Sequence, residues 1–290
     1  RIDQNRGNSH LSGPLPRLIH NRIASVALYF TKNYLAHFTP QFLFISGDKN
    51  LRHSSQTMGE LYWFDLFLIP LGLYFLFKSQ NKYKYVFFSW FILSPFPGSL
   101  TIEAPHASRA MFVLGGWQAI SAMGTYFIFN QIKSKKFRLG FVLTMILFFT
   151  FSFIYYFYNY ILKYPIISSE DWQFGYKEVF SIYKDQFSKF DNIVISDRLS
   201  QPYIFALFYL KYDPSKYRSE VEYNTSIRRK TSLVKSFGKF IFTDINFDNI
   251  PKGKSLIFAS PDEKLINIPS QDVVLNLDRS VAFYVYEYSK

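Results

Sequence analysis

Long apolar runs without charged residues fill the middle of this chain. Residues 85–102, 110–132 and 139–162 contain no Asp, Glu, Lys or Arg, and residues 61–77 contain only Asp65. A helix that crosses the ~30 Å hydrocarbon core of a bilayer needs roughly 20 mostly apolar residues. The pattern therefore predicts four transmembrane helices, at about 61–78, 85–101, 110–131 and 139–162.

A different pattern precedes these runs. Ile23, Val26, Phe30, Tyr34 and Phe38 recur at spacings of three and four, which predicts a helix over residues 22–38 with one apolar stripe. Next to transmembrane helices we interpret it as an interfacial helix, although a helix packed in a core has the same periodicity. Residues 1–21 are polar and contain Gly and Pro, so they are expected to form a loop.

After residue 163 the charged residues return and the apolar runs become short. Residues 171–189 and 201–211 have helical patterns. Strands are expected at 193–196, 240–243, 256–259, 273–277 and 281–286. The sequence thus predicts three regions: residues 1–60 as an outer loop, 61–163 as a transmembrane region, and 164–290 as a small α/β domain. The expected fold class is a polytopic α-helical membrane protein followed by this extracytoplasmic α/β domain.

The basic residues suggest an orientation in the membrane. Residues 78–84 and 133–138, which connect expected helices, are rich in Lys and Arg, and such loops face the cytoplasm. Residues 1–60, the loop 101–109 and the region after 163 would then lie outside a plasma (inner) membrane that the chain crosses several times. The net charge is +12, and residues 61–162 carry eight basic and two acidic residues. Because this surplus belongs to the membrane region, no nucleic-acid partner is expected.

Composition excludes several kinds of chemistry. The chain has no cysteine, so it has no disulfide, no thiolate metal site and no cysteine nucleophile. The motifs GxGxxG, GxxxxGK[ST], HExxH and GxSxG are absent. The five histidines lack the spacing of metal ligands, so neither a metal site nor a cofactor is predicted. Asp65, near the start of an apolar run, and Ser196-Asp197-Arg198, after an expected strand, are both interpreted as structural.

Two polar clusters remain as candidate chemistry, and the expected topology places both at the outer membrane surface. One contains Asp48, Arg52 and His53 and continues to Glu60, and the other contains Glu103, His106 and Arg109. Arginine donates two parallel hydrogen bonds to a phosphate, and histidine can share a proton with it. The same residue types also contact lipid headgroups without any catalytic role.

These clusters lie in segments that resemble bacterial membrane glycosyltransferases of the GT-C fold. The segments are NYLAHFTPQFLFISGDKNLRHSSQTMGELYWFDLFLIPLGLYFLF and LTIEAPHASRAMFVL, and later DWQFGYKEVFSIY, ISDRLSQPYIFALFYLKYDPSKY, LIFASPDE and VAFYVYEYS. The resemblance covers about residues 20–290. The enzymes that the chain resembles are family 39-like, and they are relatives of protein O-mannosyltransferases and lipid A aminoarabinose transferases.

The resemblance implies a transferase that moves a sugar from a polyprenyl-phosphate-linked donor to a protein or lipid acceptor at the outer membrane face. In the family, an acidic residue in the first outer loop acts as the base, and the reaction inverts the anomeric carbon. Nothing in this chain corresponds to that loop, so the base is expected upstream of Arg1 and the fragment is expected to be inactive alone. Asp48, Arg52, His53, Glu60, Glu103, His106 and Arg109 would bind the donor.

A second interpretation comes from another functional class. A membrane-anchored binding or assembly protein, whose outer domain recognises a glycan or a protein, needs no catalytic base. A transporter is a third alternative, but it would need polar or broken helices near the middle of the membrane, and the cluster of Pro95, Pro97 and Gly98 lies near the end of its run.

Overall fold

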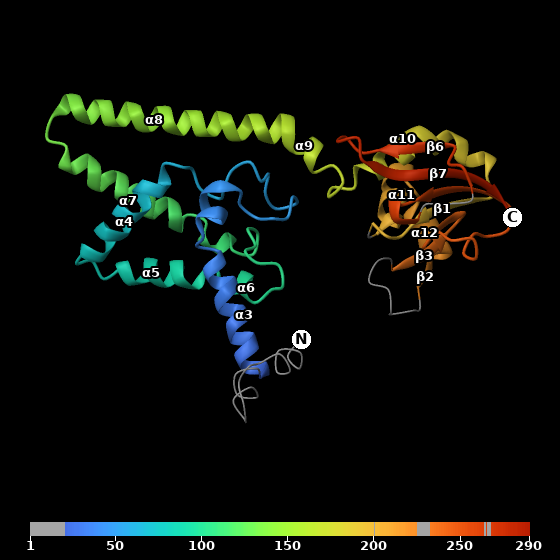
Figure 1. Ribbon diagram of the computed structural model, residues 1–290, viewed down its shortest axis with the longest axis horizontal. Helices are drawn as coiled ribbons and strands as arrows, with labels where there is room; N and C mark the ends of the chain where they lie inside the picture. Colours follow the sequence, from blue (N-terminus) through green and yellow to red (C-terminus); the bar gives the residue numbers. More distant parts are fainter. Residues whose placement is uncertain (1–20, 200, 225–232, 264, 266–267) are drawn as a thin grey trace, which may run out of the picture. The chain divides into compact units, whose positions relative to one another are not determined.

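The computed structural model describes residues 21–199, 201–224, 233–263, 265 and 268–290, which form two compact units, Arg1–Leu162 and Lys163–Lys290 (Figure 1). The loop expected over residues 1–21, with His10 and His20, lies outside the described residues except for Asn21. Each unit is treated separately below.

The first unit is helical. Its α-helices are α3 (Arg22–Ala36), α4 (Asp65–Lys78), α5 (Lys84–Leu93), α6 (Phe96–Ser99), α7 (Gly116–Gln131) and α8 (Lys135–Tyr158). The helix expected over 22–38 is thus confirmed, as α3. None of its residues is buried, so it is not a core helix. The Asn33 amide on α3 donates to the backbone carbonyls of Ser99 (3.2 Å) and Thr101 (3.0 Å), and these bonds hold the start of the 101–109 loop.

Glycines bring α4 and α7 together. A Cβ atom at Gly72 would lie 1.9 Å from the carbonyl oxygen of Ile120, and one at Gly124 would lie 2.1 Å from that of Leu68. Only residues without a side chain allow two helices to approach this closely. The Ser121 hydroxyl also donates to the carboxylate of Asp65, so α7 is fixed to the first turn of α4.

The prediction of a polytopic helical membrane protein with four spanning helices is wrong. Within the described residues, two helical stretches are long and apolar enough to cross a membrane, Met111–Gln131 and Lys135–Ile167. Helix α4 has 14 residues and α5 has 10, which at 1.5 Å per residue give about 21 and 15 Å of helix. The chain is instead a mixed α/β protein, because its second unit contains a seven-stranded sheet.

The corrected helices end for local reasons that hydropathy does not reveal. Pro95 and Pro97 divide the apolar run 85–101 into α5 and the short α6, because a proline has no backbone N–H to donate to the carbonyl four residues before it. At the start of the run 61–78, the Asp65 carboxylate accepts a hydrogen bond from the backbone N–H of Tyr62 (3.1 Å), and the helix begins only at Asp65.

The described residues of the second unit form a sheet with the strand order β2-β3-β4-β1-β5-β7-β6. The central strand β1 (Asn192–Ser196) is parallel to its neighbours β4 (Phe240–Thr243) and β5 (Lys254–Ala259). The outer strands β2 (Glu222–Tyr223), β3 (Val234–Phe237), β6 (Asp272–Leu275) and β7 (Val281–Ser289) pair antiparallel. The five expected strands are confirmed as β1, β4, β5, β6 and β7, whereas β2 and β3 were not predicted.

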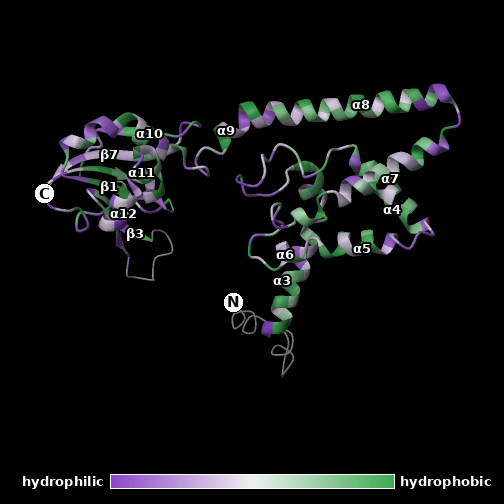
Figure 2. Cartoon of the chain, turned by 180° about the vertical axis from the view of Figure 1, so that it is seen from behind, coloured by the Kyte–Doolittle hydropathy of each residue, from purple (hydrophilic) through white to green (hydrophobic). Residues whose placement is uncertain are grey.

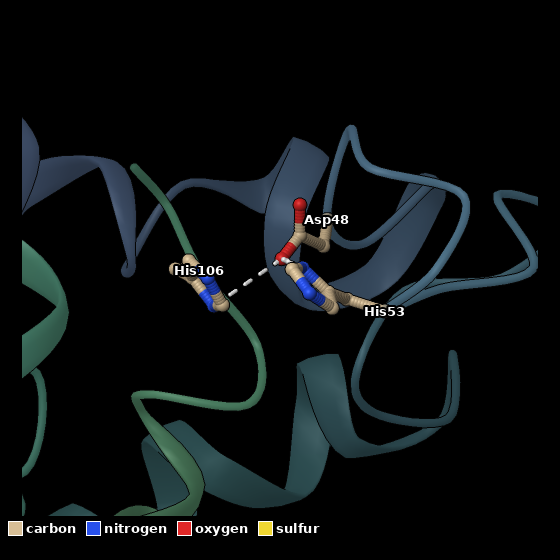
Figure 3. A group of neighbouring side chains, drawn as sticks. All are labelled: Asp48, His53 and His106. Atoms are coloured by element: carbon tan, nitrogen blue, oxygen red, sulfur yellow. Dashed lines mark hydrogen bonds and ion pairs between the residues drawn. The ribbon is translucent and has the colours of Figure 1, made fainter. Parts of the chain in front are cut away.

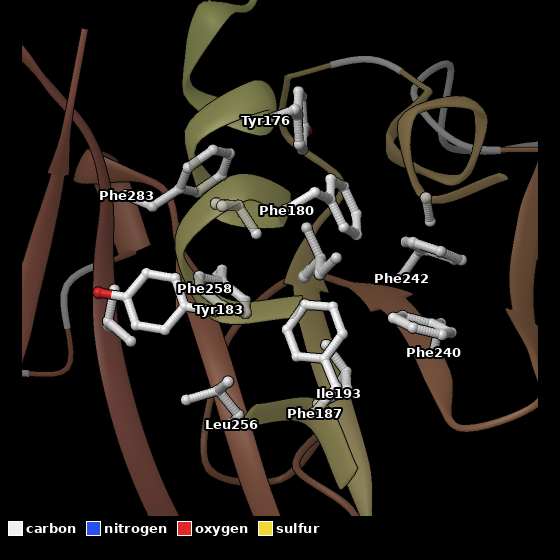
Figure 4. Close-up of a cluster of buried hydrophobic side chains, with 14 of the residues drawn as sticks. Tyr176, Phe180, Tyr183, Phe187, Ile193, Phe240, Phe242, Leu256, Phe258 and Phe283 are labelled. Carbon is white, nitrogen blue, oxygen red and sulfur yellow. The ribbon is translucent and has the colours of Figure 1, made fainter. Parts of the chain in front are cut away.

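Alternating residues of β1 supply two cores. Ile193 and Ile195 lie in the larger core with Tyr176 and Phe180 of α10 (Phe174–Tyr183). Figure 4 shows Ile193 in this core. Val194 points to the opposite face, into a smaller core with Ile257 of β5. Helices α9 (Tyr164–Ile167), α11 (Pro202–Leu210) and α12 (Pro214–Glu220) complete the unit.

Candidate functional site

The site is built around Asp48, which joins the two polar clusters found in the sequence. Its Oδ1 accepts the backbone N–H of Asn50 (2.9 Å), and its Oδ2 accepts the backbone N–H of Ala107 (2.8 Å) and His53 Nδ1–H (3.1 Å). Asp48 is only 4% exposed. A buried carboxylate that accepts these three hydrogen bonds fixes the loop 47–60 against the loop 101–109.

A tight turn sets the direction of Asp48. The preceding Gly47 has φ +69, and a Cβ atom there would lie 2.6 Å from Ser54 Oγ. Glycine meets both demands, because it adopts positive φ without strain and leaves room for the returning loop. Upstream, Phe42, Leu43 and Phe44 of the turn Gln41–Ile45 are buried and hold the start of this loop in the first unit.

His106 comes from the second loop and lies against His53. The two rings stack with centroids 4.3 Å apart, and His106 is 3% exposed. Its Nδ1 accepts from the backbone N–H of Arg109 (3.4 Å) and from Ser108 Oγ (3.2 Å), and lies 3.8 Å from Asp48 Oδ2. Burial lowers the pKa of His106, and the positive charge of Arg109 lowers it further, so the neutral ring is favoured.

His37, the residue that follows α3, supports this arrangement, and sequence reasoning missed it. The backbone N–H of His106 donates to His37 Nε2 (3.1 Å), so the proton of the neutral His37 ring is on Nδ1, which donates to the carbonyl of Asn33 (2.8 Å). Burial lowers the pKa of His37 and favours this neutral form. The apolar spacing predicts a helix over residues 22–38, which includes His37. That spacing does not indicate that His37 contacts His106, 69 residues away.

His53 has the orientation of a histidine in a carboxylate–histidine pair. Because the Asp48 carboxylate can only accept, His53 Nδ1 is the donor, and Nε2 then carries the lone pair of a neutral ring. The side chain is 23% exposed, whereas those of Asp48 and His106 are 6% and 4% exposed. His53 is therefore the member of this group that meets the adjoining cavity.

That cavity has a volume of about 320 Å³ and is lined by both polar and apolar side chains. The polar ones are Arg52, His53, Glu60, Ser108 and Gln118. The remainder is lined mainly by apolar side chains, namely Phe42, Leu43, Leu61, Ala107, Ala110, Met111, Val113, Leu114 and Trp117. Such a cavity suits an amphiphilic ligand with one polar or charged end.

Glu60 lies where this cavity meets a second one. Glu60, Leu61 and Gln118 line both, and the second cavity, of about 330 Å³, also contains Tyr62, Asp65 and Tyr156. Glu60 is exposed as a residue, but the protein around its carboxyl group removes water from it, and its pKa is raised to about 7. Desolvation is the largest cause, the negative charge of Asp48 contributes to the rise, and the hydrogen bond from the Asp48 backbone N–H opposes it. Glu60 can therefore bind or release a proton near neutral pH.

The structure thus brings together four of the seven residues proposed from sequence, namely Asp48, His53, His106 and Glu60. Arg52 lines the cavity beside His53, and its side chain is exposed. Glu103 and Arg109 are also exposed, in the same loop as His106, but they do not line the cavity. Trp117 and Gln118 were not proposed, because they lie in an apolar run that showed only a membrane helix.

The second unit contains a separate polar cluster that is internally satisfied. Glu263 accepts hydrogen bonds from the hydroxyls of Ser196 and Ser260 and from the backbone N–H of Ile245, and its Oε1 lies 3.3 Å from Arg198 Nε. These bonds tie the ends of β1, β4 and β5 together, which agrees with a structural role for Ser196.

Comparison with protein-family models, with curated proteins and with solved structures finds no match to this chain. The function is therefore argued from the site alone.

Proposed function

We propose that this chain is part of a membrane glycosyltransferase, and that the cavity beside Asp48 binds a polyprenyl-phosphate-linked sugar donor. The single observation that carries the proposal is the mixed lining of the cavity, which combines Arg52 and His53 with mainly apolar side chains. A polyprenyl phosphate has the same combination, with a charged phosphate at one end of a hydrocarbon chain.

The residues take the following roles in this proposal. Arg52 binds the phosphate, and Asp48 positions His53 through Nδ1, so that in the doubly protonated ring Nε2–H can donate to the phosphate. In sugar transfer, the acceptor oxygen bonds to the anomeric carbon as the bond from that carbon to the phosphate oxygen breaks, and a base takes the acceptor proton. Negative charge then develops on the departing phosphate, where the Arg52 guanidinium stabilises it.

The proposal places the protein in the plasma membrane through the helical stretches Met111–Gln131 and Lys135–Ile167. Nearly all of α8 is exposed, Ser152 being its only buried residue, and Figure 2 shows apolar residues along it. Lys133 lies in the turn between the stretches, and Lys135 and Lys136 begin the second stretch, so the positive-inside rule puts this turn in the cytoplasm. The site loops and the second unit would then face the outside, where a protein or lipid acceptor is met.

Binding of a fluorescent polyprenyl phosphate to the purified chain in detergent tests the proposal. We expect the wild type to prefer the phosphate over the matching polyprenol, and we expect Arg52→Gln to weaken phosphate binding by about tenfold, the loss of one charge-assisted contact. Lys136→Gln is the matched control, because it removes an exposed positive charge at the start of α8.

Equal binding of the phosphate and the alcohol, or equal effects of the two substitutions, would refute the donor site.

A further inference from the structure

Three potential metal ligands from two distant loops meet beside the cavity. One ligand atom each from Asp48, His53 and His106 lie within 4.8 Å of one another, and Figure 3 shows the Asp48 carboxylate next to both imidazole rings. Sequence spacing does not indicate this group, because His53 and His106 are 53 residues apart and no local spacing connects them.

The distances are close to those of an edge of a metal coordination shell. Zinc binds imidazole nitrogen and carboxylate oxygen at about 2.0–2.2 Å, which in a tetrahedron separates neighbouring ligand atoms by about 3.4 Å. Asp48 Oδ2 lies 3.1 Å from His53 Nδ1 and 3.8 Å from His106 Nδ1. All three ligand atoms lie within 4.8 Å of one another, so a closer approach of the two imidazole rings would bring them to one ion.

The surrounding hydrogen bonds hold these ligands in place. Ala107 and Asn50 donate backbone N–H groups to Asp48, and His37 accepts the backbone N–H of His106. Outer contacts of this kind orient the ligands of metal sites. Binding would require His106 Nδ1 to give up its hydrogen bonds from Ser108 Oγ and the Arg109 N–H. The His53 proton would move from Nδ1 to Nε2.

We propose that Asp48, His53 and His106 bind one divalent transition-metal ion, with Zn²⁺ as the preferred ion. Two imidazoles and one carboxylate are a ligand set that suits zinc and leaves a coordination position open. The role of the ion in transfer rests on the proposed function: metal on Nδ1 leaves His53 with an Nε2–H group, which can donate to the donor phosphate. Binding of the ion itself does not depend on that function.

Metal titration of the purified, tag-free chain tests this proposal. After treatment with a chelator and its removal, Zn²⁺ is titrated by calorimetry, and Co²⁺ is added to a second sample to record its visible absorption spectrum. We expect one site per chain and a Co²⁺ spectrum typical of four or five ligands. We expect His53→Gln and His106→Gln to weaken binding by at least about tenfold.

Two controls keep the result clear. Glu103→Gln removes an exposed carboxylate from the same loop as His106 and should leave metal affinity unchanged. His53→Gln is the main variant, because its partly exposed side chain can be replaced with less risk to folding than that of Asp48. Circular dichroism of each variant checks that the fold is retained.

The proposal is overturned if the wild type shows no stoichiometric binding, or if His53→Gln and Glu103→Gln bind equally well. Polyprenyl phosphate binding is measured on the same samples. Lipid binding without metal binding would refute the metal site and leave the proposed function supported. Metal binding without lipid binding would refute the proposed function and leave the metal site supported.

Discussion

Asp48 is the residue on which the candidate site depends most. Its carboxylate accepts hydrogen bonds from a backbone group 59 residues away and from His53 in its own loop. Sequence reasoning selected Asp48 for its residue type and its nearness to Arg52 and His53. The contact with Ala107 could not be predicted, because a backbone N–H has no side-chain signature.

Glu60 gives a pH-dependent stability that can be measured. Its pKa in the folded protein is about 7, above the ordinary value of 4.5. Between these values the folded state keeps a proton that the unfolded state has released, so the free energy of unfolding falls as the pH rises through this window. Below 4.5 and above 7 this contribution no longer changes with pH.

We therefore expect Glu60→Gln to reduce the loss of stability between pH 5 and pH 7.5. The melting temperature of both proteins, measured in the same detergent at several pH values, checks this. Parallel curves for the wild type and the variant would show that the Glu60 carboxyl has an ordinary pKa.

At the scale of elements, the packing of α4 on α7 positions the cavity. Trp117 and Gln118 in the first turn of α7 line it, and Gly72 and Gly124 allow the close approach of the two helices. The hydrophobic pattern predicted an apolar segment at each of these helices but neither the start of α4 nor its neighbour. Glycines inside an apolar run indicate close helix packing, and this signal is separate from the length of the run.

Replacing Gly72 by alanine should separate these helices. The new methyl group would overlap the carbonyl of Ile120, so we expect a loss of about 2 kcal/mol in stability. Gly140→Ala is the matched control, because no atom lies within 4 Å of a Cβ atom at that position on α8. Thermal unfolding of the two variants checks the difference, and equal melting temperatures would contradict the close packing of α4 and α7.

At the scale of the whole molecule, the two units were predictable to different degrees. In the second unit, apolar runs at Ile193, Phe240 and Leu256 mark the parallel centre of the sheet, because buried strands are apolar on both faces. The edge strand β2 has two exposed residues and β3 is short, so neither has a clear pattern. In the first unit, run length overstated the number of spanning helices, because apolar composition does not show where a helix ends.

The central claim is that the cavity beside Asp48 holds a polyprenyl phosphate, and photolabelling tests it most directly. A photoreactive polyprenyl phosphate is bound to the purified chain, illuminated and located by mass spectrometry of peptides. We predict labelling of the segments around residues 42–61 and 107–118, which line the cavity, and loss of label with excess polyprenyl phosphate but not with polyprenol. Labelling confined to residues 163–290, or displaced equally by both competitors, would contradict this account.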